Sequence, residues 1–197
     1  MSLKIRLQQF LLLGFLVYSI QSNTPIKEYL VRRDAFSGFK AAEYSVYDKD
    51  KKHLYYRIES KVSILQNVEL RAQPSKKVIG RLNAKLNLLT YKGEFSILNQ
   101  NENQWINGEI KQNFQMLGTL FSIEWNGKRI NMESEPVSLT YRFFDVSGKL
   151  LAECRFRLSS MFWAAKYDLR IFSNEFPEEL YLLVLAARDR ASGAKSG

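Results

Sequence analysis

The sequence has little of the chemistry on which metal centres and covalent catalysis depend. Its 197 residues include one cysteine, Cys154, and one histidine, His53. A single cysteine excludes a disulfide within the chain, and one cysteine with one histidine cannot fill a Cys/His zinc site. The acidic stretch Asp48-Lys49-Asp50 also lacks the glycine and the later glutamate of a calcium-binding loop. We therefore expect neither a metal nor another cofactor.

Proline and glycine are scarce as well, with four and ten residues, which excludes a proline-rich linker and a glycine-rich repeat. No run of five or more like charges occurs, so the chain has no basic arm for nucleic acid. The charges nevertheless sum to +9 at pH 7, from 29 lysines and arginines against 20 acidic residues. This excess favours anionic partners, with acidic lipid head groups preferred over nucleic acid; a surface that serves only solubility is the alternative.

Residues 1–22 have the order of features found in a secretory signal peptide. Lys4 and Arg6 are followed by an apolar run from Phe10 to Ile20, by small residues and by a polar break. The run is shorter than the roughly 20 residues of a standard membrane-spanning helix. We predict a signal peptide or a membrane anchor, and a helix packed on the domain is the alternative. The location implied is the secretory pathway or a membrane.

The rest of the chain is dominated by short apolar–polar alternations. Aromatic residues make up 13% of the sequence and favour strands. Segments of period two follow one another at intervals of about 8–12 residues, which is typical of a β-sandwich or barrel. The count is roughly eleven to twelve strands. The clearest examples are residues 43–47, 54–58, 62–70, 78–82, 86–91, 94–98, 104–110 and 167–172.

Two turns have recognisable residues. Asn126-Gly127 tolerates the positive φ values of a type I′ turn, which predicts a hairpin between residues 121–125 and 128–132. Asp145-Val146-Ser147-Gly148 has its glycine late in the loop, which predicts a four-residue hairpin connection.

The alternation ends at Phe176, where a helix is predicted to run to Arg190. Pro177 suits the first helical position, and acidic residues follow it at the positive end of the helix dipole. Leu180 to Ala187 is apolar on every side, so this helix has no face for solvent and must be buried. The sequence therefore predicts a mainly β fold: a closed antiparallel barrel of about twelve strands around a buried hydrophobic C-terminal helix. Residues 191–197 are predicted to be a disordered tail.

This layout resembles the tubby C-terminal-like superfamily, in particular its LURP-one-related and phospholipid scramblase-like branches. Three stretches carry the likeness: residues 44–48 with 56–61, residues 143–150, and residues 167–172 leading into 178–185. The resemblance covers about residues 28–190 and places the barrel domain there. It implies a barrel closed around a central helix and non-enzymatic work at membranes, including binding of phospholipid or phosphoinositide head groups. Such domains usually face the cytosol, so the cytoplasmic face of a membrane is the alternative location.

The residues give no support for an enzyme. His53 stands in a charged turn, where a surface histidine is the ordinary interpretation. Cys154 has apolar residues two positions away on either side in an alternating segment, so we expect a buried, unreactive thiol. Dinucleotide, Walker and nucleophile-elbow patterns are all missing from the sequence.

Four basic residues form the candidate contact with anionic lipid: Lys76, Lys77, Arg81 and Lys85. Lys76 and Lys77 follow a turn and are expected to be exposed. Arg81 and Lys85 lie a few residues further on, where we expect them to share a rim with the first two. Each such base is worth about 1 kcal/mol near an anionic surface. The predicted function is thus a non-enzymatic module that binds anionic phospholipid. One alternative is a secreted or endomembrane structural or protein-interaction domain without lipid specificity. Another is a barrel that holds a small apolar ligand, which is disfavoured because the apolar helix would fill the interior.

Overall fold

Twelve antiparallel strands form a closed barrel around one helix. The computed structural model describes residues 24–34, 42–61, 66–86, 90–113, 118–135, 138–160 and 164–193, with residues 85, 86, 192 and 193 described by backbone alone. The strands are β1 (Lys27–Arg33), β2 (Tyr44–Asp48), β3 (Leu54–Ser60), β4 (Gln66–Ala72), β5 (Val78–Leu86), β6 (Tyr91–Asn99), β7 (Gln104–Asn113), β8 (Thr119–Trp125), β9 (Lys128–Ser134), β10 (Thr140–Asp145), β11 (Leu150–Phe156) and β12 (Lys166–Ile171). Sequence neighbours pair throughout, and β1 closes the barrel on β12.

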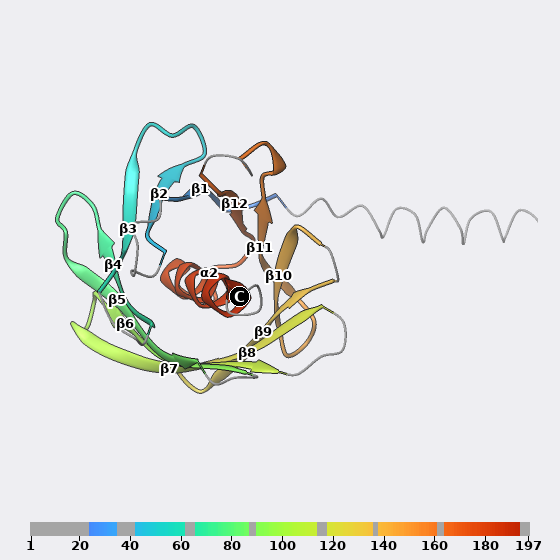
Figure 1. Ribbon diagram of the computed structural model, residues 1–197. Coiled ribbons are helices and arrows are strands. Elements are labelled where there is room, and N and C mark those ends of the chain that lie inside the picture. The colour runs from blue at the N-terminus through green and yellow to red at the C-terminus, as the bar shows by residue number, and fades with distance from the viewer. Residues whose placement is uncertain are drawn as a thin grey trace, which may run out of the picture.

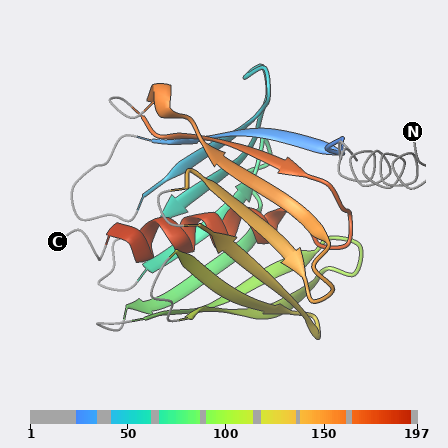
Figure 2. The same ribbon diagram turned by 90° about the vertical axis from the view of Figure 1, so that its right-hand side faces the viewer.

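The barrel axis is occupied by helix α2 (Glu178–Gly193), as the apolar run predicts. Figure 1 looks down the barrel and shows α2 inside the ring of strands, and Figure 2 shows the same helix lying across the interior. Every residue from Leu180 to Ala187 is at most 3% exposed. The inner faces of the strands supply most of the remaining core residues. The fold class predicted from the sequence is confirmed.

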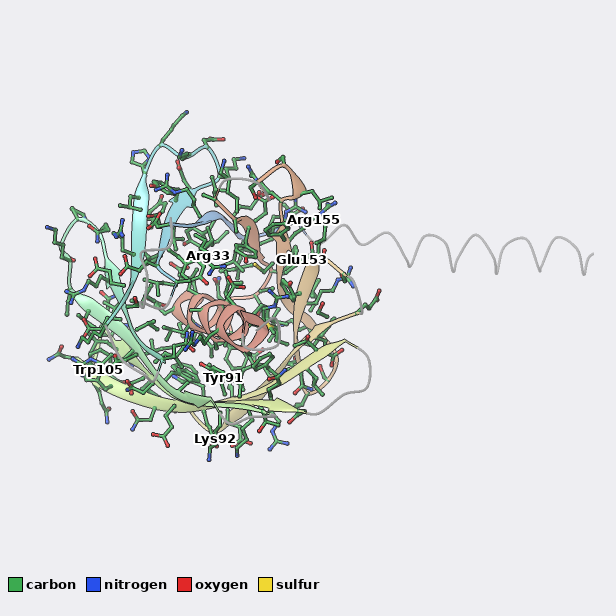
Figure 3. The ribbon with its side chains drawn as sticks, in the orientation of Figure 1. Arg33, Tyr91, Lys92, Trp105, Glu153 and Arg155 are labelled. Carbon is green, nitrogen blue, oxygen red and sulfur yellow. The ribbon has the colours of Figure 1, made fainter. Side chains whose placement is uncertain are left out.

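Side chains alternate between the core and the outer wall along the strands. Tyr91 and Lys92 are consecutive in β6, and Figure 3 shows Tyr91 on the inner side toward α2 and Lys92 pointing away from it. Tyr91 is 1% exposed, whereas Lys92 lies at the surface. This alternation is the physical basis of the period-two pattern from which the strands were predicted.

The two predicted hairpins are present with the expected turn geometry. Asn126 and Gly127 both have positive φ values, 49° and 72°, and join β8 to β9. Gly148 has a φ of 85°, and its N–H donates to the carbonyl of Asp145 at 3.1 Å in the β10–β11 turn.

Two predicted boundaries differ from the structure, and other predicted segments lie outside its described residues. Residues 86–91 are not one strand, because β5 ends at Leu86 and β6 begins at Tyr91. Helix α2 continues to Gly193, so residues 191–193 are helical although they were assigned to the tail; Ala191 is 5% exposed because it still packs on the core. The predicted signal or anchor segment, residues 1–22, and residues 194–197 lie outside the described residues.

Polar contacts hold the last turns of α2 to the barrel. The Asp189 carboxylate, 5% exposed, accepts hydrogen bonds from the hydroxyls of Tyr44 at 2.7 Å and Tyr167 at 2.9 Å. The amide of Gln66 donates to the carbonyl of Ala186 at 3.0 Å and accepts from Tyr91. These contacts come from β2, β12, β4 and β6, so they fix both the depth and the rotation of the helix.

Glycine at position 108 is required by close packing. A Cβ atom at Gly108 would lie 2.4 Å from Cζ of Phe95 and 2.6 Å from the backbone oxygen of Glu124. Gly108→Ala should therefore lower the free energy of unfolding by about 1–3 kcal/mol, measured by chemical denaturation. Asn83→Ala, at an exposed outer position of β5, is the control and should change stability by less than about 0.5 kcal/mol. Equal effects of the two substitutions would contradict this account.

Asp189→Ala leaves two buried tyrosine hydroxyls without their acceptor. We expect a loss of about 3 kcal/mol in the free energy of unfolding, because each hydroxyl gives up a hydrogen bond to a charged group. Arg190→Ala, at the next and exposed position, is the matched control. A loss no larger than that of the control would show that the contacts of Asp189 do not hold the helix.

Candidate functional site

The predicted lipid-contact residues do not meet at one rim. Lys76 and Lys77 lie exposed in the turn between β4 and β5. The turn is held by Arg71, whose guanidinium donates to the carbonyl of Lys76 at 3.2 Å, and Lys76 has a φ of 58°. Both ammonium groups therefore stand on a supported turn at one end of the barrel.

Arg81 and Lys85 follow along β5. Arg81 lies on the outer wall with its guanidinium carbon 4.6 Å from the centre of the Trp105 ring, a cation–π contact with β7. Lys85 pairs with Lys92 in the β5–β6 register, and its side chain is outside the described ones. At about 3.3 Å per residue, Lys85 is roughly 26 Å along the strand from Lys77. The four residues therefore form a line down the wall.

Antiparallel pairing gathers other basic residues around Lys76 and Lys77. Connections alternate between the two ends of the barrel, so one end carries the short turns after β2, β4, β6, β8 and β10, together with the β12–α2 connection and the start of β1. We call this the hairpin end. The turn after β2 lies next to the turn after β4, since the N–H of Gln73 donates to the carbonyl of Tyr55 at 2.8 Å.

The turn after β2 is ordered by Asp48. Its carboxylate accepts from the backbone N–H groups of Lys52 at 2.6 Å and His53 at 3.0 Å. These N–H groups, that of His53 most strongly, hold the pKa of Asp48 below its usual value, so it remains ionised. We define the basic hairpin surface as the exposed lysines of the two turns: Lys49, Lys51, Lys52, Lys76 and Lys77.

Exposed apolar side chains share this end of the barrel. Four large apolar residues are exposed among the described ones, and three of them, Ile26, Tyr55 and Val146, are at the hairpin end, with exposed fractions of 47%, 44% and 79%. The fourth, Leu158, is at the opposite end. Apolar and basic groups occur together in this way where a protein surface meets a lipid head-group layer.

The N-terminus of α2 lies in the mouth of the barrel at the hairpin end. The Glu178 carboxylate contacts the ammonium of Lys27 from β1 and the hydroxyl of Tyr56 from β3. Glu179, the next residue, lines two hollows of about 330 and 400 Å³ beside this mouth. Burial raises the pKa of Glu179 above its usual value, and the neighbouring carboxylate of Glu178 adds to the rise.

The two residues considered for nucleophilic chemistry lie apart. The His53 side chain is 74% exposed in its turn, 3.4 Å from Asp48. Cys154 is 1% exposed on the inner face of β11, and burial raises the pKa of its thiol, which stays protonated. Within the described residues, no group of three or more His, Cys, Asp or Glu side chains could hold a metal ion.

Comparison of the chain with family models, with curated proteins and with solved structures finds no match. Among the described residues, no helix is both long enough and apolar enough to span a membrane.

Lys49, Lys51 and Lys52 belong to the basic hairpin surface, although the sequence interpretation did not select them as candidate contacts. The sequence places all three in a polar turn, and the turn of Lys76 and Lys77 lies two connections further on. Antiparallel pairing of consecutive strands brings alternate turns to the same end of a sheet. Applied to the charged turns, this rule places these three lysines at the same end of the barrel as Lys76 and Lys77.

The raised pKa of Glu179 makes stability depend on pH. Below about pH 4.5 the carboxyl is protonated in both states, and above it the unfolded chain ionises first. The free energy of unfolding, relative to Glu179→Gln, should therefore fall as pH rises from 4.5 through the higher pKa of the folded state. Urea denaturation across this pH range measures the difference. A difference between the wild type and Glu179→Gln that stays constant across this range would contradict the account.

Proposed function

We propose that the protein is a non-enzymatic binding module that docks its hairpin end on an anionic phospholipid surface. The observation that carries the proposal is the gathering of five exposed lysines and three exposed apolar side chains at one end of a rigid barrel. Lysines attract head groups, and the apolar side chains suit the boundary beneath them.

The charges at the basic hairpin surface are sufficient for reversible binding. At about 1 kcal/mol for each base near an anionic surface, five lysines contribute about 5 kcal/mol before any loss. Asp50 lies exposed in the same turn and offsets part of this attraction. Asp48 is occupied by the backbone of its own turn, which limits its repulsion of head groups.

The position of β1 agrees with this orientation. Strand β1 begins at Lys27 at the hairpin end, shortly after the apolar run that ends at Ile20. If residues 1–22 serve as a membrane anchor, the chain enters the barrel from the side that carries the lysines. The anchor and the head-group contact would then act on the same bilayer.

The resemblance to the tubby C-terminal-like superfamily points in the same direction. That resemblance implies a barrel closed around a C-terminal helix, the architecture that this chain has. The buried, protonated Cys154 and the exposed His53 support a function without catalysis. The proposal therefore includes membership of the tubby C-terminal-like superfamily. It also includes a location at a membrane, on the secretory or the cytoplasmic side.

Vesicle co-sedimentation of the full chain tests it. Lys76→Gln/Lys77→Gln should weaken binding to phosphatidylcholine vesicles containing phosphatidylserine about thirtyfold, because two bases at about 1 kcal/mol each are lost. Binding should also weaken as salt is raised. Phosphatidylcholine vesicles alone measure any contribution from the apolar N-terminal run.

The matched control is Arg155→Gln/Lys166→Gln. These substitutions remove the same charge near the opposite end of the barrel, where β11 ends and β12 begins. Figure 3 labels Arg155 beside β11. The control should change binding less than twofold. An equal loss in both double variants would attribute binding to net charge alone, and no preference for the anionic vesicles at low salt would overturn the proposal.

A further inference from the structure

The barrel wall has a notch beside β7. Pairing between β7 and β8 begins at Gly108 and Trp125, whereas pairing between β6 and β7 begins at Asn99 and Gln104. Residues 104–107 of β7 therefore pair with β6 alone among the described strands. Their other edge leaves main-chain N–H and C=O groups available to an added strand.

A groove of about 1270 Å³ extends over β5 to β9 and borders this notch at Asn107, which is the one residue of 104–107 that lines it. Asn107 and Gly108 of β7 line it, and so do Glu94 of β6 and Glu124 of β8. The β12–α2 connection contributes Phe176, 4% exposed, whose ring centre is 6.4 Å from that of Trp125. The groove thus combines an unpaired strand edge, polar walls and an aromatic base.

The groove is acidic on a basic protein. Five carboxylates and three cations line it, a formal charge of −2, whereas the whole chain carries +9. All three cations are already paired: Lys92 with Glu109 at 2.7 Å, Lys128 with Glu175 at 3.2 Å, and Arg129 with Glu124. Glu94 is exposed and forms no ion pair within 4 Å among the described side chains, although its charge also acts on Lys92.

The wall of the groove also holds an unsatisfied donor. The indole Nε1 of Trp125 is buried and has no hydrogen-bond acceptor among the described residues. Buried polar groups without a partner are rare in folded proteins. The chain therefore supplies, beside the free edge of β7, a donor for which it has no acceptor of its own.

We propose that this groove binds an extended basic peptide, which adds as a strand to residues 104–107 of β7 and brings a lysine or arginine toward Glu94 on the other side of β7. Main-chain hydrogen bonds give such strand addition its affinity, and the side-chain contacts give it specificity. The partner is a protein segment with positive charge. The groove shares Val146 with the exposed apolar side chains of the hairpin end but none of the five lysines, so this inference rests on other observations than the lipid proposal.

Fluorescence anisotropy with labelled peptides tests the inference on the full chain. The probe is a short peptide of alternating lysine and valine, and the comparison peptide has glutamate in place of lysine. We expect the lysine peptide to bind in the groove and the glutamate peptide not to bind there. Glu94→Lys should weaken that binding about fivefold or more, because attraction is replaced by repulsion.

Two controls separate the groove from general electrostatics. Glu28→Lys makes the same change of charge at an exposed position of β1, on another part of the wall, and should alter affinity less than twofold. A lysine peptide with N-methylated backbone keeps its charge but cannot pair with a strand edge, and it should bind at least tenfold more weakly. Equal losses in the two variants, equal binding of the methylated peptide, or no binding of the lysine peptide would each overturn the inference.

Discussion

The structure depends on the burial of one helix that has no solvent face. From Leu180 to Ala187 every side chain of α2 is apolar and buried. Each fully buried large apolar side chain contributes about 1.5–3 kcal/mol, so this segment is stable only when it is enclosed on all sides. A closed sheet is the arrangement that encloses it, and the sheet in turn needs the helix to fill its interior. Strands and helix are therefore parts of one core, and neither is a complete folding unit.

The same constraint shapes the surface. Because the interior is filled, functional groups are confined to the outer wall and to the two ends of the barrel. The tight turns at the hairpin end have little freedom, since Asp48 fixes one of them and Arg71 supports another. Because the backbone of such turns is already fixed, only the lysine side chains remain to be ordered in any contact that they make. The barrel acts as a rigid frame, and its turns present charge in a defined direction.

Much of the fold can be predicted from the sequence because its signals are local. Alternation identifies most strands, Asn126-Gly127 identifies a turn, and the apolar run identifies the central helix. The candidate site is harder to predict from the sequence, because it depends on which residues face one another across paired strands. Arg81 faces Trp105 across an intervening strand. The notch beside β7 arises because pairing between β7 and β8 begins only at Gly108. These relations are set by packing between distant residues, such as Phe95 over Gly108, and no short stretch of sequence contains them.

The order of elements along the chain also affects how the protein is made. The closing pair of the barrel joins Lys27 to Ile171, and the helix that fills the interior comes last. During synthesis the growing chain must carry its strands, with their apolar faces uncovered, until α2 has left the ribosome. Contacts between such distant residues also form slowly. The barrel thus completes its core only after α2 has emerged, and the nascent strands depend on protection from aggregation until then.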